Sequence, residues 1–355
     1  MANRFIVQSG GVASGNCDTL GTAGTLAYVF GSTSPVVAGD TIYWCAGAAG
    51  ASYDITTASQ QLVRSATGTS NAHVTVIGCN SSGVVNGAMP EVRATGTWAT
   101  TISMFIIGTD AGANPLRYYD WLNVNWNAND LSYNVWNNSG TTGTGAGTNT
   151  TAYYHTFNNC RFQKSKHNGF SAFSGGVGTE VDNSFVFTNC EISGCGIVSS
   201  GAAAIGRGSN AATWVMDNCR ITGNQTGISL LAASDKTFTA SNCTFSDSTN
   251  GQGLSSQQMK INAYGCTFSG NNGSGLAFFA SGDGSSIQHC RFLSNLTGIS
   301  DAGWNGSYTS PYNRNLFNGN GNNFEDSVGG FITPPGQGNV YNQDYFPHFR
   351  GRAPR

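Results

Sequence analysis

The feature that most constrains the fold is a short motif around one cysteine, which recurs six times between residues 160 and 292. Each copy reads cysteine, any residue, then phenylalanine or isoleucine, and successive cysteines lie 30, 29, 24, 23 and 24 residues apart. This pattern has period two, so it predicts a strand with the cysteine and the large apolar side chain on one face. A short strand buries such a face only by stacking on equivalent strands, so six copies predict a solenoid. The six cysteines are Cys160, Cys190, Cys219, Cys243, Cys266 and Cys290.

We expect these cysteines to form a buried, reduced column, because an unpaired cysteine in a core behaves as a small hydrophobic residue. The chain has neither a Cys-x-x-Cys pair nor a His/Cys spacing typical of a metal site, so no metal is expected. An asparagine precedes four of the cysteines, and asparagine tolerates left-handed backbone. We expect the amides of these asparagines to hydrogen-bond to one another from coil to coil. We expect this ladder to weaken where Gly265 and His289 replace asparagine. The four are Asn159, Asn189, Asn218 and Asn242.

These repeats, together with the stretch Ala38-Gly-Asp-Thr-Ile-Tyr-Trp44, resemble the right-handed parallel β-helix proteins. That superfamily includes pectate-lyase-like enzymes, phage tailspikes and other virion β-helices. The resemblance implies an all-β chain: a single-stranded right-handed parallel β-helix, or solenoid, of roughly ten coils. Composition agrees with a chain poor in helix, since 49 of the 355 residues are glycine. In the coil before Cys160, we expect Leu122 and Val124 at the cysteine and phenylalanine positions.

Three segments are predicted from where the repeat begins and ends. Residues 1–34 are expected to form an N-terminal cap or attachment segment, residues 35–309 the parallel β-helix, and residues 310–355 an extended C-terminal docking segment. Five of the eight prolines lie in 311–354, and proline removes strand donors. Aromatic and arginine side chains often anchor protein partners. The candidate partner-binding residues are Tyr341, Tyr345, Phe346, Phe349, Arg350 and Arg352.

The search for chemistry on the predicted outer face finds no catalytic residue. The position between cysteine and phenylalanine includes Arg161, Glu191 and Arg220, which predicts an ion-pair ladder, whereas polysaccharide hydrolysis needs two converging carboxyls. We therefore expect no cofactor and favour a protein that is not an enzyme. Trp121, Trp126 and Trp136 crowd one stretch and are candidate glycan-binding residues, because exposed tryptophans stack on sugars. The alternative is that they pack inside larger coils.

Net charge and hydropathy exclude some classes of partner. A net charge of −2 without basic runs argues against nucleic acid, and no stretch approaches the ~18 apolar residues of a membrane span. The first residues do not read as a signal peptide, so we expect synthesis in a host cytoplasm and a final location in the virion. The favoured function is a non-enzymatic phage structural protein, such as a capsid decoration protein, head fibre or spike. The expected partners are other virion proteins, among them a major capsid or tail protein, and two further copies of this chain in a homotrimer. The alternative is a tailspike-type protein that binds or cleaves a cell-surface glycan.

Overall fold

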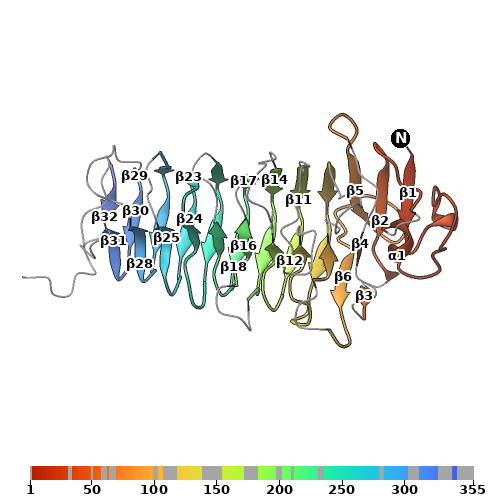
Figure 1. The fold of residues 1–355 in the computed structure, drawn as a ribbon, viewed down its shortest axis with the longest axis horizontal. Coiled ribbons are helices and arrows are strands. Elements are labelled where there is room, and N and C mark those ends of the chain that lie inside the picture. The colour runs from red at the N-terminus through yellow and green to blue at the C-terminus, as the bar shows by residue number, and fades with distance from the viewer. Residues whose placement is uncertain are drawn as a thin grey trace, which may run out of the picture.

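The chain winds into an elongated rod, in which successive coils follow one another along the axis in chain order (Figure 1). This is a computed structural model of the protein. It describes residues 2–30, 34–48, 51–56, 62–63, 69–98, 103–106, 118–137, 154–171, 183–196, 202–208, 212–230, 236–279, 284–302, 312–326 and 338–341.

Three parallel sheets run the length of the rod, because each coil contributes one strand to each sheet in turn. Sheet A has eleven strands: β1 (Asn3–Ile6), β2 (Thr41–Cys45), β5 (Val74–Cys79), β8 (Tyr119–Leu122), β11 (Tyr154–Asn158), β14 (Asn183–Thr188), β17 (Ala212–Asp217), β20 (Thr237–Ser241), β23 (Lys260–Tyr264), β26 (Ser286–Gln288) and β29 (Tyr312–Asn313).

Sheet B also has eleven strands, most of them three residues long: β3 (Tyr53–Ile55), β6 (Glu91–Ala94), β9 (Asn125–Asn127), β12 (Arg161–Gln163), β15 (Glu191–Ser193), β18 (Arg220–Thr222), β21 (Thr244–Ser246), β24 (Thr267–Ser269), β27 (Arg291–Leu293), β30 (Leu316–Asn318) and β32 (Val340–Tyr341). Sheet C has ten: β4 (Leu62–Val63), β7 (Phe105–Ile106), β10 (Trp136–Asn137), β13 (Phe170–Ser171), β16 (Ile205–Gly208), β19 (Ile228–Leu230), β22 (Leu254–Ser256), β25 (Ser274–Phe278), β28 (Thr297–Asp301) and β31 (Asn322–Asp326). The expected solenoid of roughly ten coils is confirmed.

Two left-handed residues per coil bracket the short strands of sheet B. The residue before each cysteine has φ between 51° and 65° from Asn159 to His289, and the residue four positions after each cysteine lies in the same region. Asparagine and glycine occupy most of these positions, because they adopt left-handed backbone at the lowest cost. These two bends form the corners at either end of each short strand of sheet B. The second set comprises Lys164, Gly194, Gly223, Asp247, Gly270 and Ser294.

The core changes character along the rod. In its first half, wide coils enclose large rings: Trp121, Trp126 and Trp136 are fully buried and pack edge to face, with ring centroids 5.0 to 5.6 Å apart. The sequence-based suggestion that these three tryptophans bind a glycan is therefore wrong. Their alternation in β8, β9 and β10 points them into the interior, where their apolar area stabilises the longer coils.

In the second half of the rod, phenylalanines of sheet B form a continuous stack. Phe245, Phe268, Phe292 and Phe317 follow at 4.9 to 5.0 Å, nearly parallel, and Tyr341 continues the stack at 5.3 Å. The predicted solenoid range of 35–309 is therefore too short. Strands β29 to β32 continue all three sheets beyond residue 309, with Asn315 and Asn339 replacing the cysteine. Likewise β1 pairs with β2, so residues 3–6 belong to sheet A.

The coil before Cys160 is also offset from its expected register. Trp126 pairs with Phe162, and the carbonyl of Val124 accepts from Arg161 as the carbonyl of Cys160 accepts from Glu191. Val124 therefore holds the cysteine position and Trp126 the phenylalanine position. The expected assignment of Leu122 and Val124 is wrong by two residues, because period two alone leaves such a slip undetected.

Candidate functional site

A cluster of polar and aromatic side chains lies on the outer face of sheet A, over strands β5, β8 and β11. Thr75, Asp120 and Thr156 are register partners in adjacent coils, and alternate residues of a strand share one face. One step earlier along the coils come the rings of His73 and Tyr118, and that of Tyr154 at the start of β11. We call His73, Tyr118, Asp120, Tyr154 and Thr156 the sheet-A cluster.

Asp120 connects the polar members of the sheet-A cluster. Its Oδ2 lies 3.0 Å from His73 Nδ1, and its Oδ1 accepts a hydrogen bond of 2.7 Å from the Thr156 hydroxyl. The side chains of His73 and Asp120 remain 25% and 35% exposed, so solvent reaches both. The carboxylate thus holds the imidazole and the hydroxyl in place while the site stays open to a ligand.

The three rings of the sheet-A cluster form a compact platform. The centroid of His73 lies 5.5 Å from that of Tyr118 and 5.3 Å from that of Tyr154, and the two tyrosines are stacked at 6.4 Å. Tyr118 has φ +55°, a conformation that costs energy in a bulky residue. Ring faces beside planar polar groups suit the stacking and hydrogen bonding of a sugar ring.

Sequence reasoning missed the sheet-A cluster, because its members come from the irregular coils before the first cysteine of the repeat. His73 and Asp120 are 47 residues apart, and no fixed spacing relates them to the six clear copies. The only available signal was that His73 and Tyr118 each stand directly before an apolar strand segment.

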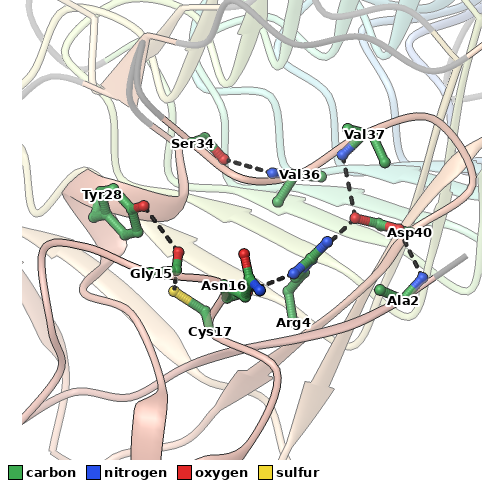
Figure 2. Close-up of polar contacts among 10 residues, drawn as sticks. All are labelled: Ala2, Arg4, Gly15, Asn16, Cys17, Tyr28, Ser34, Val36, Val37 and Asp40. Carbon is green, nitrogen blue, oxygen red and sulfur yellow. Dashed lines mark hydrogen bonds and ion pairs between the residues drawn. The ribbon is translucent and has the colours of Figure 1, made fainter.

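Asp40 forms a second polar centre, where the N-terminal segment meets the first coil (Figure 2). This buried carboxylate accepts from the backbone N–H groups of Ala2 and Val37 and pairs with Arg4 at 3.0 Å. Burial by itself raises the pKa of Asp40, but these hydrogen bonds and the Arg4 charge together hold the pKa below its ordinary value. The ion pair between Asp40 and Arg4 therefore anchors β1 to the rod.

The N-terminal segment closes the end of the core as well as extending sheet A. The helix α1 (Leu26–Val29) begins with a cap in which the Thr25 hydroxyl accepts from Tyr28 N–H. The ring of Phe30 follows it and lies 5.4 Å from Trp44 and 5.9 Å from Trp121. A 3-10 turn, η1 (Leu20–Thr22), precedes the helix. Phe30 thus covers apolar rings that an open solenoid end leaves exposed.

The six predicted core cysteines are all buried and free, each directly before a strand of sheet B. The Sγ of Cys219 donates toward the carbonyl of Phe187 at 3.4 Å and accepts from the N–H of Cys190. Burial is the main cause that raises the pKa of Cys190 well above its ordinary value. The side chains of this column fill the corner between sheets A and B.

In the predicted asparagine ladder, Asn218 donates directly to Asn189, whereas the amides of Asn159 and Asn189 are directed to asparagines outside the predicted set. The amide of Asn159 donates to Asn123 at 2.7 Å, and that of Asn218 to Asn189 at 2.6 Å, whereas the Asn189 amide lies nearest to Asn158, at 3.4 Å. The left-handed turn positions continue through Asn242, Gly265 and His289.

A buried asparagine column on the other side of sheet B was not predicted. Asn295 donates to the carbonyl of Phe268 and to Asn320, and its own side-chain oxygen accepts from Asn271 at 2.8 Å. These residues follow the cysteine position by five, a spacing that was visible in the sequence beside Cys219, Cys266 and Cys290. The column satisfies buried carbonyls of sheet B, such as that of Phe268 in β24.

The remaining sequence candidates are placed as follows. Arg161 and Glu191 face outward and approach to 3.8 Å, so they form one half-exposed pair. Tyr341 lies at the end of the phenylalanine stack. Five partner-binding candidates lie outside the described residues: Tyr345, Phe346, Phe349, Arg350 and Arg352.

Neither a membrane-spanning helix nor a metal-binding cluster is found among the described residues. No helix in this part of the chain is both long and apolar enough to cross a membrane. Nor do three or more His, Cys, Asp or Glu side chains converge there in a way that suits a metal ion.

Comparison with known proteins identifies the architecture. A family profile described as a right-handed beta helix region matches residues 202–343. The solved pectate lyase Pel9A superposes with a TM-score of 0.59 and 13% identity, over 89% of this chain and 74% of that one. The fold is a right-handed parallel β-helix.

A second solved β-helix comes from a virus. ORF18 of Geobacillus virus E2 superposes with a TM-score of 0.51 and 10% identity over 85% of this chain. The match covers 52% of ORF18, so this β-helix spans about half the length of that protein. No curated protein matches the chain in sequence. At these identities the two solved structures establish the shared fold.

Proposed function

We propose that this β-helix is a non-enzymatic structural component of a phage particle, such as a decoration protein, head fibre or spike. The observation that carries the proposal is the unbroken core from Ile6 to Tyr341, which makes the chain a rigid spacer. Neighbouring coils share all three sheets, so bending the rod requires breaking strand pairs. The likeness to ORF18 of Geobacillus virus E2 supports a viral setting.

A rod of this kind needs a point of attachment, and we place it at the C-terminal residues beyond the last described strand, β32. Tyr345, Phe346 and Arg350 are among the residue types that commonly dominate protein interfaces. The partner in this proposal is a major capsid or tail protein. Because strands β29 to β32 belong to the β-helix, we move the proposed start of the attachment segment from 310 to 342.

The test uses purified particles of the virus whose genome encodes the chain. Immunogold labelling and quantitative mass spectrometry are expected to find a fixed copy number at one location. A chain that ends at Tyr341 should fold with the same β-rich circular dichroism and fail to bind particles that lack the protein. Absence from particles overturns the structural role, and undiminished binding of the shortened chain overturns the attachment site.

A second candidate function, glycan binding, is favoured by the sheet-A cluster, since ring faces beside a carboxylate and a hydroxyl suit a sugar. Wild-type protein is expected to be retained on an array of bacterial surface oligosaccharides, and Tyr118→Ala with Tyr154→Ala is expected to weaken retention at least tenfold. The matched control is Tyr264→Ala: this tyrosine is also exposed on sheet A and lies 5.1 Å from His289. Equal retention of the cluster variant and the control contradicts glycan binding at this site.

A further inference from the structure

Two cysteines outside the repeat meet at the start of the rod. Cys45 ends β2 and Cys79 ends β5, and they are direct partners in the parallel pairing of these strands. Paired strands lie about 4.8 Å apart, which is within the Cα separation that a disulfide accepts. The two Sγ atoms lie 3.2 Å apart, and both side chains are buried.

The six-membered cysteine column also has contacts between side chains, such as those of Cys219 with Cys190 and Cys243, but its thiols bond to the backbone as well. In the column, Cys190 and Cys219 direct their Sγ atoms to backbone carbonyls at 3.3 to 3.4 Å, and Cys219 and Cys243 also accept backbone N–H groups. The Cys79 thiol points instead at the sulfur of Cys45. The Cys79 donor lowers the pKa of Cys45 against the effect of burial, and the same contact with burial raises the pKa of Cys79. Cys45 is thus the better thiolate.

We propose that Cys45 and Cys79 form a disulfide that ties two adjacent coils once the chain meets a disulfide oxidant such as oxidised glutathione. The Cys45 thiolate attacks one glutathione sulfur and releases one reduced glutathione, which takes the proton that Cys45 lost. Cys79 then attacks the mixed disulfide at Cys45, and the second glutathione leaves with the Cys79 proton. Two protein thiols and one oxidised glutathione become one protein disulfide and two glutathione thiols.

The position of the pair near the end of the rod explains how a buried pair is reached. Coils at the end of a solenoid have few neighbours and open more readily than coils in the middle. Opening of the first coils exposes Cys45 to the oxidant, whereas the column cysteines from Cys160 to Cys243 lie in the middle of the rod. The disulfide then restricts that same opening, because it closes a loop over a sequence separation of 34 residues. This inference goes beyond the proposed function and does not depend on it.

The test holds the folded, full-length protein in oxidised glutathione or in dithiothreitol, quenches with acid, and counts thiols after denaturation. The count is expected to fall from ten to eight after oxidation. Trypsin cuts after Arg4, Arg64 and Arg93, so the cross-link should join peptides 5–64 and 65–93 in mass spectrometry without reductant. The oxidised protein should also unfold at higher denaturant concentration than the reduced protein.

The matched control addresses Cys17, which shares the first peptide with Cys45. Cys17→Ala should still lose two thiols on oxidation, whereas Cys45→Ala should keep all nine. The peptide map of the wild-type protein gives the answer even if a variant folds poorly. Ten thiols remaining after oxidation, or a cross-link between cysteines of the column, overturns the proposal.

Discussion

At the scale of single residues, neighbouring positions in one coil have opposite environments. Cys243 is buried in the column, and Thr244, the next residue, faces outward at the start of β21. The left-handed Asn242 before them sets this alternation, because it fixes where the turn ends and the strand begins. A charged side chain is therefore tolerated at position 244 and excluded at position 243.

This contrast predicts the effect of a new charge. Cys243→Asp should lower the free energy of unfolding by several kcal/mol, about 3 or more, because it buries a carboxylate without a partner. Thr244→Asp should change it by about 0.5 kcal/mol or less. Denaturant unfolding of both variants measures the difference, and similar midpoints would show that the register of sheet B is wrong.

At the scale of elements, the N-terminal cap depends on a strand and a single carboxylate. The strand β1 adds only four residues to sheet A, and its attachment is completed by Arg4 and the N–H of Ala2 on Asp40. An end strand has one neighbour, so the loss of one strong contact affects it more than it affects a central strand. The cap is thus the element most sensitive to substitution.

Asp40→Asn is expected to destabilise the cap by about 2–3 kcal/mol, since Arg4 and two N–H groups lose a charged acceptor. The lowered pKa sets the pH dependence: Asp40 contributes its full stability above its ordinary value of 3.8, and this contribution is lost as pH falls through the lower pKa of the folded state. Hydrogen exchange of residues 2–6 measures both effects. Faster exchange in the wild type at neutral pH than in the variant would contradict the role of Asp40.

At the scale of the whole molecule, the rod is a one-dimensional stack in which each coil contacts its two neighbours. The interval from Cys243 to Cys266 is one complete coil, and the phenylalanine stack passes through it at a constant 4.9 Å. Coils in this region are therefore interchangeable units of the rod.

Deletion of residues 243–265 should therefore leave a folded rod that is shorter by about 4.8 Å, one strand spacing. The deletion joins Asn242 to Cys266 and restores the motif. Deletion of residues 243–254 removes about half a coil, including all of β21 and the first residue of β22. It should abolish cooperative unfolding, because the interrupted coil contributes no strand to sheet B and breaks the stack between its neighbours. Circular dichroism and small-angle scattering compare the two, and equal behaviour of both deletions would refute the interchangeable coil.

The sequence by itself determined the repeat, the inward face of the short strands, and the left-handed turns at residues such as Asn159 and Asn189. These features depend on contacts within one coil or between identical positions of neighbouring coils, so local periodicity contains them. The sequence also carried the continuation past residue 309, at Asn315 and Asn339, but there asparagine replaces the cysteine on which the alignment was based.

Only the tertiary structure decided which irregular coils bring distant residues together. Whether Trp121 faces the core or the solvent depends on coil width and on the left-handed bend at Asn123, across which the period-two alternation does not continue. Cys45 and Cys79 lie on adjacent strands, and His73 directly precedes the strand next to that of Asp120. Both pairs are separated in sequence by coils of unequal length. Stacking of the coils places residues that are far apart in sequence one strand spacing apart. The sheet-A cluster and the thiol pair therefore form only in the folded rod.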